Sequence, residues 1–427
     1  MGRGHNAIVK SVQEHLAAVL ELVGPVEPLD VVLHDAAGCV LAADVVATSD
    51  VPGVAVARCD GYALGVGDQA ADGSGEGAST RRGRHATTSG WRLPVVADVR
   101  PGPDLSPRLV TGQCVRIASG APLPPGADAV VPLEDTDRGV AEVTVPRDIS
   151  AGLNVRPVGH DVRAGTVVLA AGTRLGARQL GLAAAVGRSR LTVHPSPRVV
   201  LVAVGDELVE PGAAVAPGQV HESNRYALEA AVHDAGCTPI QAPVVADDHA
   251  ALRETLEDQL VRADVVVVTG GLSEMAHDTV KDVLPLLGDV RVDRVAISPG
   301  GRFGLGVLHG TGRDVPVLAL PGDPVAATVV FEVLVRPALC TMAGQAQIYR
   351  RSVPATVSRG WVSPDKLRQF VPATVVGDAE TGYAATVLAD PDHPALADVV
   401  RADVFVVVPE NDQTVYEGRT LPCLVLG

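Results

Sequence analysis

A run of four valines followed by two glycines most constrains the fold of this chain. Residues 265–268 are all valine, and an unbroken β-branched run is typical of a strand that is covered on both faces. Gly270 and Gly271 lack the side chains that would keep a ligand away from the backbone. Ser273 and Asp278 then bring a hydroxyl and a carboxylate just before a predicted helix. The pattern fits a ligand site at the end of a buried strand, and it fits an ordinary strand-to-helix turn equally well.

The region from residue 197 to residue 344 repeats one pattern of strand, loop and helix. Apolar runs of strand length lie at 199–204, 240–245, 264–268 and 315–320, and helical patterns follow them at 224–235, 249–260, 279–287 and 324–342. Such alternation predicts right-handed crossovers and a parallel sheet that is flanked by helices.

Acidic residues follow the strands of this region at Glu207, Asp247, Asp278 and Asp323. Because the carboxyl ends of parallel strands lie at one edge of a sheet, we expect these side chains to converge there. Asp323 stands in Pro-Gly-Asp-Pro, which fits an N-cap aspartate followed by proline at the first helical position. The same four residues also fit an anion site at a helix N-terminus, and both interpretations stay open.

The flanking regions have different patterns. Apolar spacing predicts a helix over 6–23, short β-branched runs between 31 and 158 predict a β-rich domain, and 349–427 suggests a small β-barrel or sandwich. Residues 65–90 are rich in glycine and serine and include three arginines at 81, 82 and 84. They indicate a mobile loop, with a basic phosphate-binding arm as the alternative. The expected fold class is therefore α/β and β with several domains.

Charge and composition limit the partners of the chain. Its 427 residues carry a formal net charge of −15, which argues against nucleic acid, because phosphate backbones are bound by clustered lysine and arginine. No apolar run reaches the length of a membrane span and no signal-peptide pattern opens the chain, so we expect a cytoplasmic protein. Six scattered cysteines without Cys-x-x-Cys spacing indicate reduced thiols, and Cys59 is expected to be inert.

Six short motifs stand in one order along the chain. They are Asp60-Gly-Tyr-Ala63, Arg116-Ile-x-Ser-Gly-Ala-Pro-x-Pro124, Gly126-Ala-Asp128, Gly205-Asp-Glu-Leu208, Thr269-Gly-Gly-x-Ser273 with Asp278, and Pro321-Gly-x-Pro324. In these motifs and their spacing the chain resembles the molybdopterin molybdenumtransferases, the family of MoeA and the gephyrin E domain. The resemblance extends from about Ser11 to Leu426.

The resemblance implies a domain plan and an activity. The implied domains are an elongated helical domain (6–46 with 156–196), an inserted β domain (47–155), a molybdopterin-binding-like α/β domain (197–345) and a C-terminal β domain (346–427). It further implies a homodimer in which the β domain of one subunit faces the α/β domain of the other. The implied reaction inserts molybdate into adenylylated molybdopterin and releases AMP in a Mg²⁺-dependent step.

The resemblance also implies roles for residues at matching positions. The implied catalytic set is Asp60, Ser119, Asp161, Glu207, Asp247 and Asp278. The implied pterin-phosphate contacts are Gly270, Gly271, Ser273, Arg294, Pro299, Gly300, Pro321 and Gly322. Asp278 and Glu207 are the expected Mg²⁺ ligands, in keeping with the preference of that ion for a few hard oxygen ligands.

Several positions depart from the family pattern. Ser298 and Gly301 replace two lysines, Glu274 and Asp323 add carboxylates near the expected anion, and Pro372 replaces an arginine. Each change weakens the binding of an anion. The alternative to an active enzyme is therefore an impaired paralogue that acts as a dimeric scaffold for a protein partner.

Overall fold

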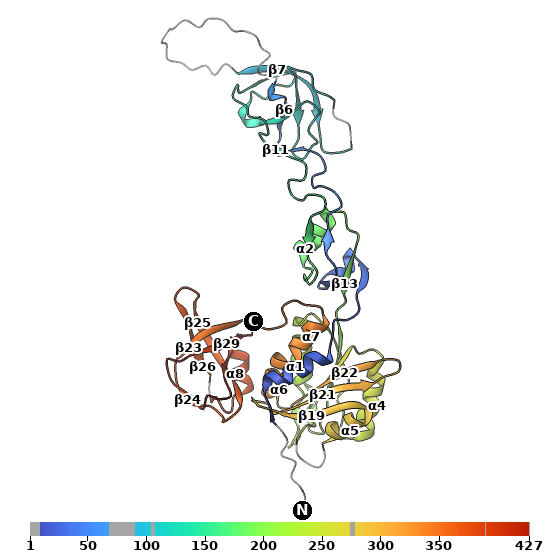
Figure 1. Ribbon diagram of the computed structural model, residues 1–427, viewed down its shortest axis with the longest axis vertical. Coiled ribbons are helices and arrows are strands. Elements are labelled where there is room, and N and C mark those ends of the chain that lie inside the picture. Colours follow the sequence, from blue (N-terminus) through green and yellow to red (C-terminus); the bar gives the residue numbers. More distant parts are fainter. Residues whose placement is uncertain (1–8, 68–89, 104–106, 274–277, 389, 427) are drawn as a thin grey trace, which may run out of the picture. The chain divides into compact units, whose positions relative to one another are not determined.

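The computed structural model describes residues 9–67, 90–103, 107–273, 278–388 and 390–426 (Figure 1). The chain forms two compact units. One unit spans Asp44–Ala170 and Ala177–Arg190, and the other contains the remaining residues. The sequence predicts four domains, and this division into two units does not separate them. Their boundaries therefore stay a prediction.

The larger unit is built on a seven-stranded sheet in the order β1-β19-β21-β22-β18-β14-β17. Its strands are β1 (Val9–Lys10), β14 (Arg198–Ala203), β17 (Thr238–Gln241), β18 (Val265–Thr269), β19 (Gly288–Val295), β21 (Arg302–His309) and β22 (Asp314–Leu320). The predicted parallel strands β22, β18, β14 and β17 lie side by side. Every residue of β18 is buried, as the valine run predicts.

The sheet as a whole is mixed, because two strands that the sequence did not predict, β19 and β21, extend the four parallel strands. β19 pairs antiparallel with β21, and β21 pairs antiparallel with β22. Strand β17 is also shorter than the predicted 240–245. Pro243 offers no N–H to the ladder, and beyond it only Val245 makes a further bridge, to Val204.

Helices cover both faces of this sheet (Figure 1). Helices α1 (Val12–Leu22), α3 (Asn224–Asp234), α6 (Pro324–Val330) and α7 (Arg336–Met342), with a π-helical turn at Phe331–Val335, share one core with alternate strand residues such as Leu201 and Val267. Helices α4 (His249–Leu260) and α5 (Thr279–Leu287) share the other core with Val202 and Val268. Because successive residues of a strand point to opposite faces of the sheet, the same strands contribute to a core on each face.

Residues 324–342 form the one described stretch that is long and apolar enough to cross a membrane. The most apolar part of this stretch is 72% buried inside the protein. It packs against the sheet in the same core as α1, so burial in the protein accounts for its apolar composition.

The C-terminal region is a closed five-stranded barrel. Its strands are β23 (Ser352–Val357), β25 (Arg368–Asp378), β26 (Gly382–Val387), β27 (Val404–Val408) and β29 (Thr420–Val425). β25 pairs with both β26 and β27, which closes the ring through β23 and β29. Short elements complete this region: β20 (Ile297–Ser298), β24 (Trp361–Val362), β28 (Thr414–Val415) and α8 (Leu396–Arg401). Pro372 is buried in β25 opposite Phe405. Val371 and Ala373 on either side of it belong to the barrel core, so Pro372 lies on the outer face of the barrel.

The smaller unit contains a five-stranded sheet in the order β10-β7-β8-β6-β9. The strands are β6 (Gly61–Leu64), β7 (Trp91–Val99), β8 (Cys114–Ile117), β9 (Ala129–Pro132) and β10 (Glu142–Val145). Short pairs join β4 (Val45–Val46) to β12 (Val167–Leu169) and β5 (Val56–Ala57) to β11 (Val155–Arg156), and α2 spans Ala177–Ala185. A three-stranded sheet of β2 (Leu29–Val32), β13 (Arg190–His194) and β3 (Val40–Leu41) belongs, except for Arg190, to the larger unit. Most of the glycine- and serine-rich segment lies outside the described residues.

His15 is an apolar-core histidine on α1. It is 0% exposed, and its ring meets Phe303 edge-on with centroids 5.0 Å apart. Within the described part of the chain neither ring nitrogen has a hydrogen-bond partner. Burial lowers the pKa of His15 to about 4, although Asp293 lies 3.6 Å away and opposes this shift. Desolvation therefore outweighs the ion pair.

The pKa of His15 predicts a stability loss in acid. Between pH 6.5 and about 4 the unfolded chain takes up a proton that the folded protein refuses, so stability is full above this range and falls through it. The loss is up to about 3 kcal/mol. Replacing His15→Leu should flatten this part of the profile in thermal unfolding at pH 7.0, 5.5 and 4.5. An unchanged profile would contradict the assignment.

Candidate active site

A cavity of about 420 Å³ lies at the carboxyl edge of the parallel strands. It is lined by the loops that follow β14, β17, β18 and β22 and by residues near the start of β21. Nine of the residues expected from the sequence line it together: Glu207, Asp247, Gly270, Gly271, Ser273, Asp278, Gly300, Pro321 and Gly322. The sheet therefore brings together side chains from positions more than 100 residues apart in the sequence.

Gly270 and Gly271 are required by close packing. At Gly270 a Cβ atom would lie 2.3 Å from the carbonyl oxygen of Val204, and at Gly271 it would lie 2.6 Å from a methyl group of Val280. Both residues have positive φ, +93° and +62°, a region that side chains disfavour. The two glycines thus satisfy a turn and also line the cavity, so the two interpretations of this loop are compatible.

Asp278 has the most distinctive environment in the cavity. It is the N-cap residue of α5, yet its side chain makes no capping hydrogen bond. Its side chain is largely buried, and Oδ2 has no hydrogen-bond partner among the described residues. An unpaired carboxylate oxygen in a buried position is costly, and a cation or a hydrogen-bond donor from a ligand would relieve this cost.

The other two carboxylates, those of Glu207 and Asp247, lie on loops that are joined by hydrogen bonds. The backbone N–H of Asp206 donates to Asp247 Oδ2 (3.2 Å), and the backbone N–H of Asp247 donates to Asp206 Oδ1 (2.9 Å). Glu207 folds its carboxylate over Gly205, where an added Cβ would lie 2.5 Å from Oε2. Asp206 therefore joins two loops of the cavity, a role that the sequence did not indicate.

Arg302 is the basic residue that sequence reasoning missed. It lines the cavity, whereas the expected Arg294 and Pro299 do not. Arg294 is exposed on β19, directly opposite Arg302 in the β19–β21 ladder. The signal was present in the sequence, because Arg302 stands one position after Gly301, which replaces a family lysine.

Asp323 and Glu274 are the two carboxylates that depart from the family pattern. Asp323 accepts a hydrogen bond from the backbone N–H of Ala326 (2.8 Å) and caps α6, with Pro324 at the start of the helix. It does not line the cavity, so the capping interpretation accounts for it. Glu274 lies outside the described residues.

In the smaller unit the structure brings Asp60 and Ser119 together. The backbone N–H of Ser119 donates to Asp60 Oδ1 (2.7 Å), and the Ser119 hydroxyl donates to the carbonyl oxygen of Arg58 (3.1 Å). Asp161 forms an ion pair with Arg156 and does not line the cavity beside Asp60.

That second cavity, of about 350 Å³, is lined by Asp60, Asp98 and three arginines, Arg100, Arg116 and Arg138. Arg116 donates to both carboxylate oxygens of Asp98 (2.6 and 2.7 Å), and this raises the pKa of Arg116. Sequence reasoning did not assign these arginines to a site.

Cys59 lies beside the same loop and fits the prediction of an inert thiol. Burial, followed by the nearby carboxylates of Glu134 and Asp60, raises the pKa of Cys59. A raised pKa keeps a thiol protonated and unreactive.

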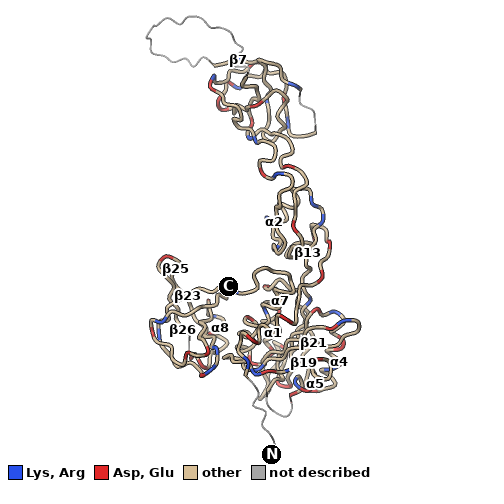
Figure 2. Tube along the Cα trace, viewed as in Figure 1, with Lys and Arg blue, Asp and Glu red and all other residues tan. Residues whose placement is uncertain are grey.

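Local charge determines what the first cavity can bind. Figure 2 shows acidic and basic residues interspersed along the described trace, so the net charge of the chain does not describe any one site. Among the described residues, the cavity is lined by three carboxylates, those of Glu207, Asp247 and Asp278, and by one guanidinium, that of Arg302. This charge balance suits a divalent cation together with an anionic ligand, because a phosphate alone would meet net repulsion.

Comparison with known proteins agrees with this geometry. Residues 10–187 match the MoeA N-terminal region (domain I and II), and residues 200–341 match the probable molybdopterin binding domain. Molybdopterin molybdenumtransferase 1 of Mycobacterium tuberculosis is 38% identical over 98% of this chain and 99% of its own length. Molybdopterin molybdenumtransferase 2 of the same organism is 38% identical over 85% of this chain and 87% of its own.

Solved structures show the same fold over nearly the whole chain. Two molybdopterin biosynthesis MoeA proteins from Pyrococcus horikoshii have TM-scores of 0.79 and 0.75, at 30% and 24% identity. Each covers 98% of this chain, and the matches span 99% and 100% of theirs. The chain therefore belongs to the molybdopterin molybdenumtransferase family.

Proposed function

We propose that this protein is a molybdopterin molybdenumtransferase of molybdenum cofactor biosynthesis. It takes adenylylated molybdopterin and molybdate as substrates, inserts the metal and releases AMP. Family membership over nearly the full chain supports the reaction class. The observation that carries the proposal within the structure is Asp278 Oδ2, which is buried in a cavity at the carboxyl edge of the sheet and has no hydrogen-bond partner among the residues that the structure describes.

Mg²⁺ fits this cavity, with Asp278 and Glu207 as its protein ligands. Among the described residues no cluster of three or more acidic, histidine or cysteine side chains could hold a metal ion unaided. Mg²⁺ is commonly held by one or two carboxylates together with substrate phosphates and water. When bound, it would neutralise charge on the phosphoanhydride and polarise it.

The residues of the chain position the anionic substrate. The glycine loop 270–271 and Gly322 offer close approach to the backbone, and Arg302 supplies the positive charge. Asp247 keeps the loop of Glu207 in register through Asp206. Asp60, Ser119 and Asp161 remain proposed contributors from the smaller unit.

We further propose a cytoplasmic homodimer. All six cysteines are free, which suits a reducing compartment, and the family resemblance supports the dimer. Sedimentation equilibrium at micromolar protein would give twice the chain mass of 43.8 kDa. No observation favours the scaffold alternative.

The decisive experiment is a turnover assay with adenylylated molybdopterin, molybdate and Mg²⁺. The expected result is AMP release that requires Mg²⁺ and forms active cofactor, as scored by reconstitution of a molybdenum-free apoenzyme. If the folded protein binds the adenylylated pterin without releasing AMP, the scaffold alternative replaces the enzyme.

Replacing Asp278→Ala should lower the rate of AMP release by about 100-fold or more, because a metal ligand is worth several kcal/mol of charge stabilisation. The thermal midpoint should stay equal or rise, because Oδ2 of the removed carboxylate is buried without a hydrogen-bond partner among the described residues.

The matched control is Asp282→Ala, which removes an exposed carboxylate from the first turn of the same helix. Its activity should stay near that of the wild type. Equal activity of Asp278→Ala and Asp282→Ala would show that the metal site is misplaced.

Replacing Arg302→Ala should raise KM for the adenylylated pterin by about 10- to 100-fold, the range for a charge-assisted hydrogen bond. Replacing Arg294→Ala, its cross-strand neighbour outside the cavity, should change KM less than threefold. The reverse order of effects would assign the substrate contact to Arg294 instead.

A further inference from the structure

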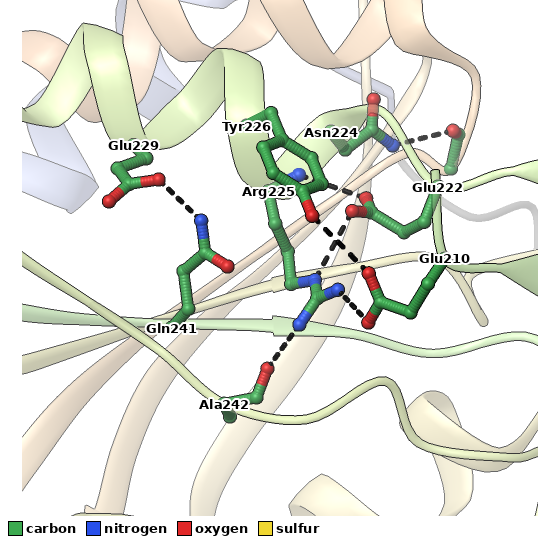
Figure 3. A network of polar contacts seen from close by, with 9 residues as sticks. Glu210, Glu222, Asn224, Arg225, Tyr226, Glu229, Gln241 and Ala242 are labelled. Carbon is green, nitrogen blue, oxygen red and sulfur yellow. Dashed lines mark hydrogen bonds and ion pairs between the residues drawn. The ribbon is translucent and has the colours of Figure 1, made fainter. Parts of the chain in front are cut away.

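Helix α3 begins beside the cavity, and its first two side chains point away from the helix into neighbouring loops. The residue before it, Ser223, makes no capping hydrogen bond. Asn224 and Arg225 instead make contacts with residues of three other segments (Figure 3). Neither residue lines the cavity.

Asn224 holds the loop that follows β22. Its Nδ2 donates to the carbonyl oxygen of Gly322 at 2.8 Å. Gly322 lines the cavity, and a Cβ added there would lie 3.3 Å from the Cα of Gly270. The hydrogen bond from Asn224 therefore fixes a backbone segment that packs directly on the glycine loop.

Arg225 is buried, and each of the three nitrogens of its guanidinium group donates a hydrogen bond (Figure 3). Nη1 donates to the carbonyl oxygen of Ala242 (2.6 Å), Nη2 to Glu210 Oε1 (2.6 Å) and Nε to Glu222 Oε2 (3.2 Å). Burial opposes the positive charge, but the hydrogen bonds to Glu210 and Glu222 outweigh it and raise the pKa of Arg225.

The segment held by Arg225 carries Glu207. Strand β15 (Leu208–Val209) follows Glu207 and pairs with β16 (Val220–His221). The N–H of Val220 donates to the carbonyl oxygen of Glu207 (2.8 Å). The pair is parallel, and the salt bridges from Arg225 to Glu210 and Glu222 hold the residues that follow the two strands, at one end of the pair.

Ala242 connects the same arginine to a third loop. It ends the region of β17 and stands shortly before Val245, which bridges to Val204, and before Asp247, which lines the cavity. Two consecutive residues are thus bonded to the segments that lead to Glu207, Asp247 and Gly322.

We propose that Asn224 and Arg225 are positioning residues that hold these three loops of the cavity in register for catalysis. The kinetic part of this inference rests on the proposed molybdenumtransferase activity. A displacement of about 1 Å in an organised site can cost about 100-fold in rate. Residues that hold the loops in place therefore affect turnover although they do not touch the substrate.

Asn224→Ala is the informative variant. It removes one neutral hydrogen bond from a half-buried site, whereas replacing Arg225 would leave Glu222 buried without its partner and threaten the fold. The matched control is Gln345→Ala, because Gln345 Nε2 likewise donates to a backbone carbonyl, that of Ala235 (2.6 Å), and Gln345 does not line the cavity.

The first readout is hydrogen exchange of the full-length protein without substrate. Asn224→Ala should speed exchange at least fivefold in peptides covering 318–323 and 268–272, while Gln345→Ala leaves them unchanged. Asn224→Asp, which keeps the shape but offers no N–H, should behave like the alanine variant. Unchanged exchange in both Asn224 variants would overturn the proposal.

The second readout separates positioning from stability. Asn224→Ala should lower kcat/KM for AMP release about tenfold or more, with kcat affected, at a temperature where wild type and both variants are fully folded. A lower thermal midpoint with wild-type kcat and KM would show a structural role only and would refute positioning. If the wild type itself releases no AMP, the proposed function fails, and hydrogen exchange still decides whether Asn224 holds the loop.

Discussion

The fold of the larger unit depends on the burial of β18 on both faces. Val265–Val268 alternate between two hydrophobic cores, one shared with α1, α3, α6 and α7 and the other with α4 and α5. With both faces covered, the carboxyl edge of the parallel strands is where backbone and side chains can meet a ligand. The candidate site therefore lies where the packing of the sheet leaves room for it.

The same packing explains why the site contains so many glycines. The loop after β18 passes close to Val204 on one side and to Val280 on the other, and any side chain at Gly270 or Gly271 would collide with them. Close packing and ligand access both require glycine at these positions. A sequence pattern alone cannot assign the glycines to one cause.

The sequence predicted the parts of the structure that follow from local periodicity. The limits of α4 and α5 agree with the predicted ranges, and the carboxylates Glu207, Asp247 and Asp278 converge as expected. Strand β19 was missed because its half-exposed alternation contains many polar residues. The network of Arg225 was also missed, because its partners are residues 210, 222 and 242, and only the tertiary fold places them together.

The departures from the family pattern also look different once the side chains are placed. Asp323 is a helix cap, and Pro372 is a buried residue of β25; neither lines the cavity. Arg302 returns a positive charge beside the segment in which Ser298 and Gly301 replace lysines. A comparison of aligned positions shows only that two lysines are lost. The binding of an anion depends instead on which charged side chains line the cavity.

One electrostatic conflict remains, and it explains the composition of the site. Three carboxylates and one guanidinium repel a phosphate taken alone, yet the substrate of the proposed reaction is anionic. A divalent cation reverses this balance, because it is attracted by the carboxylates and in turn attracts the phosphate. Under the proposed function, the acidic residues that oppose a phosphate alone would make substrate binding depend on Mg²⁺. Asp278, whose Oδ2 is buried without a hydrogen-bond partner among the described residues, is the residue that we propose for that role.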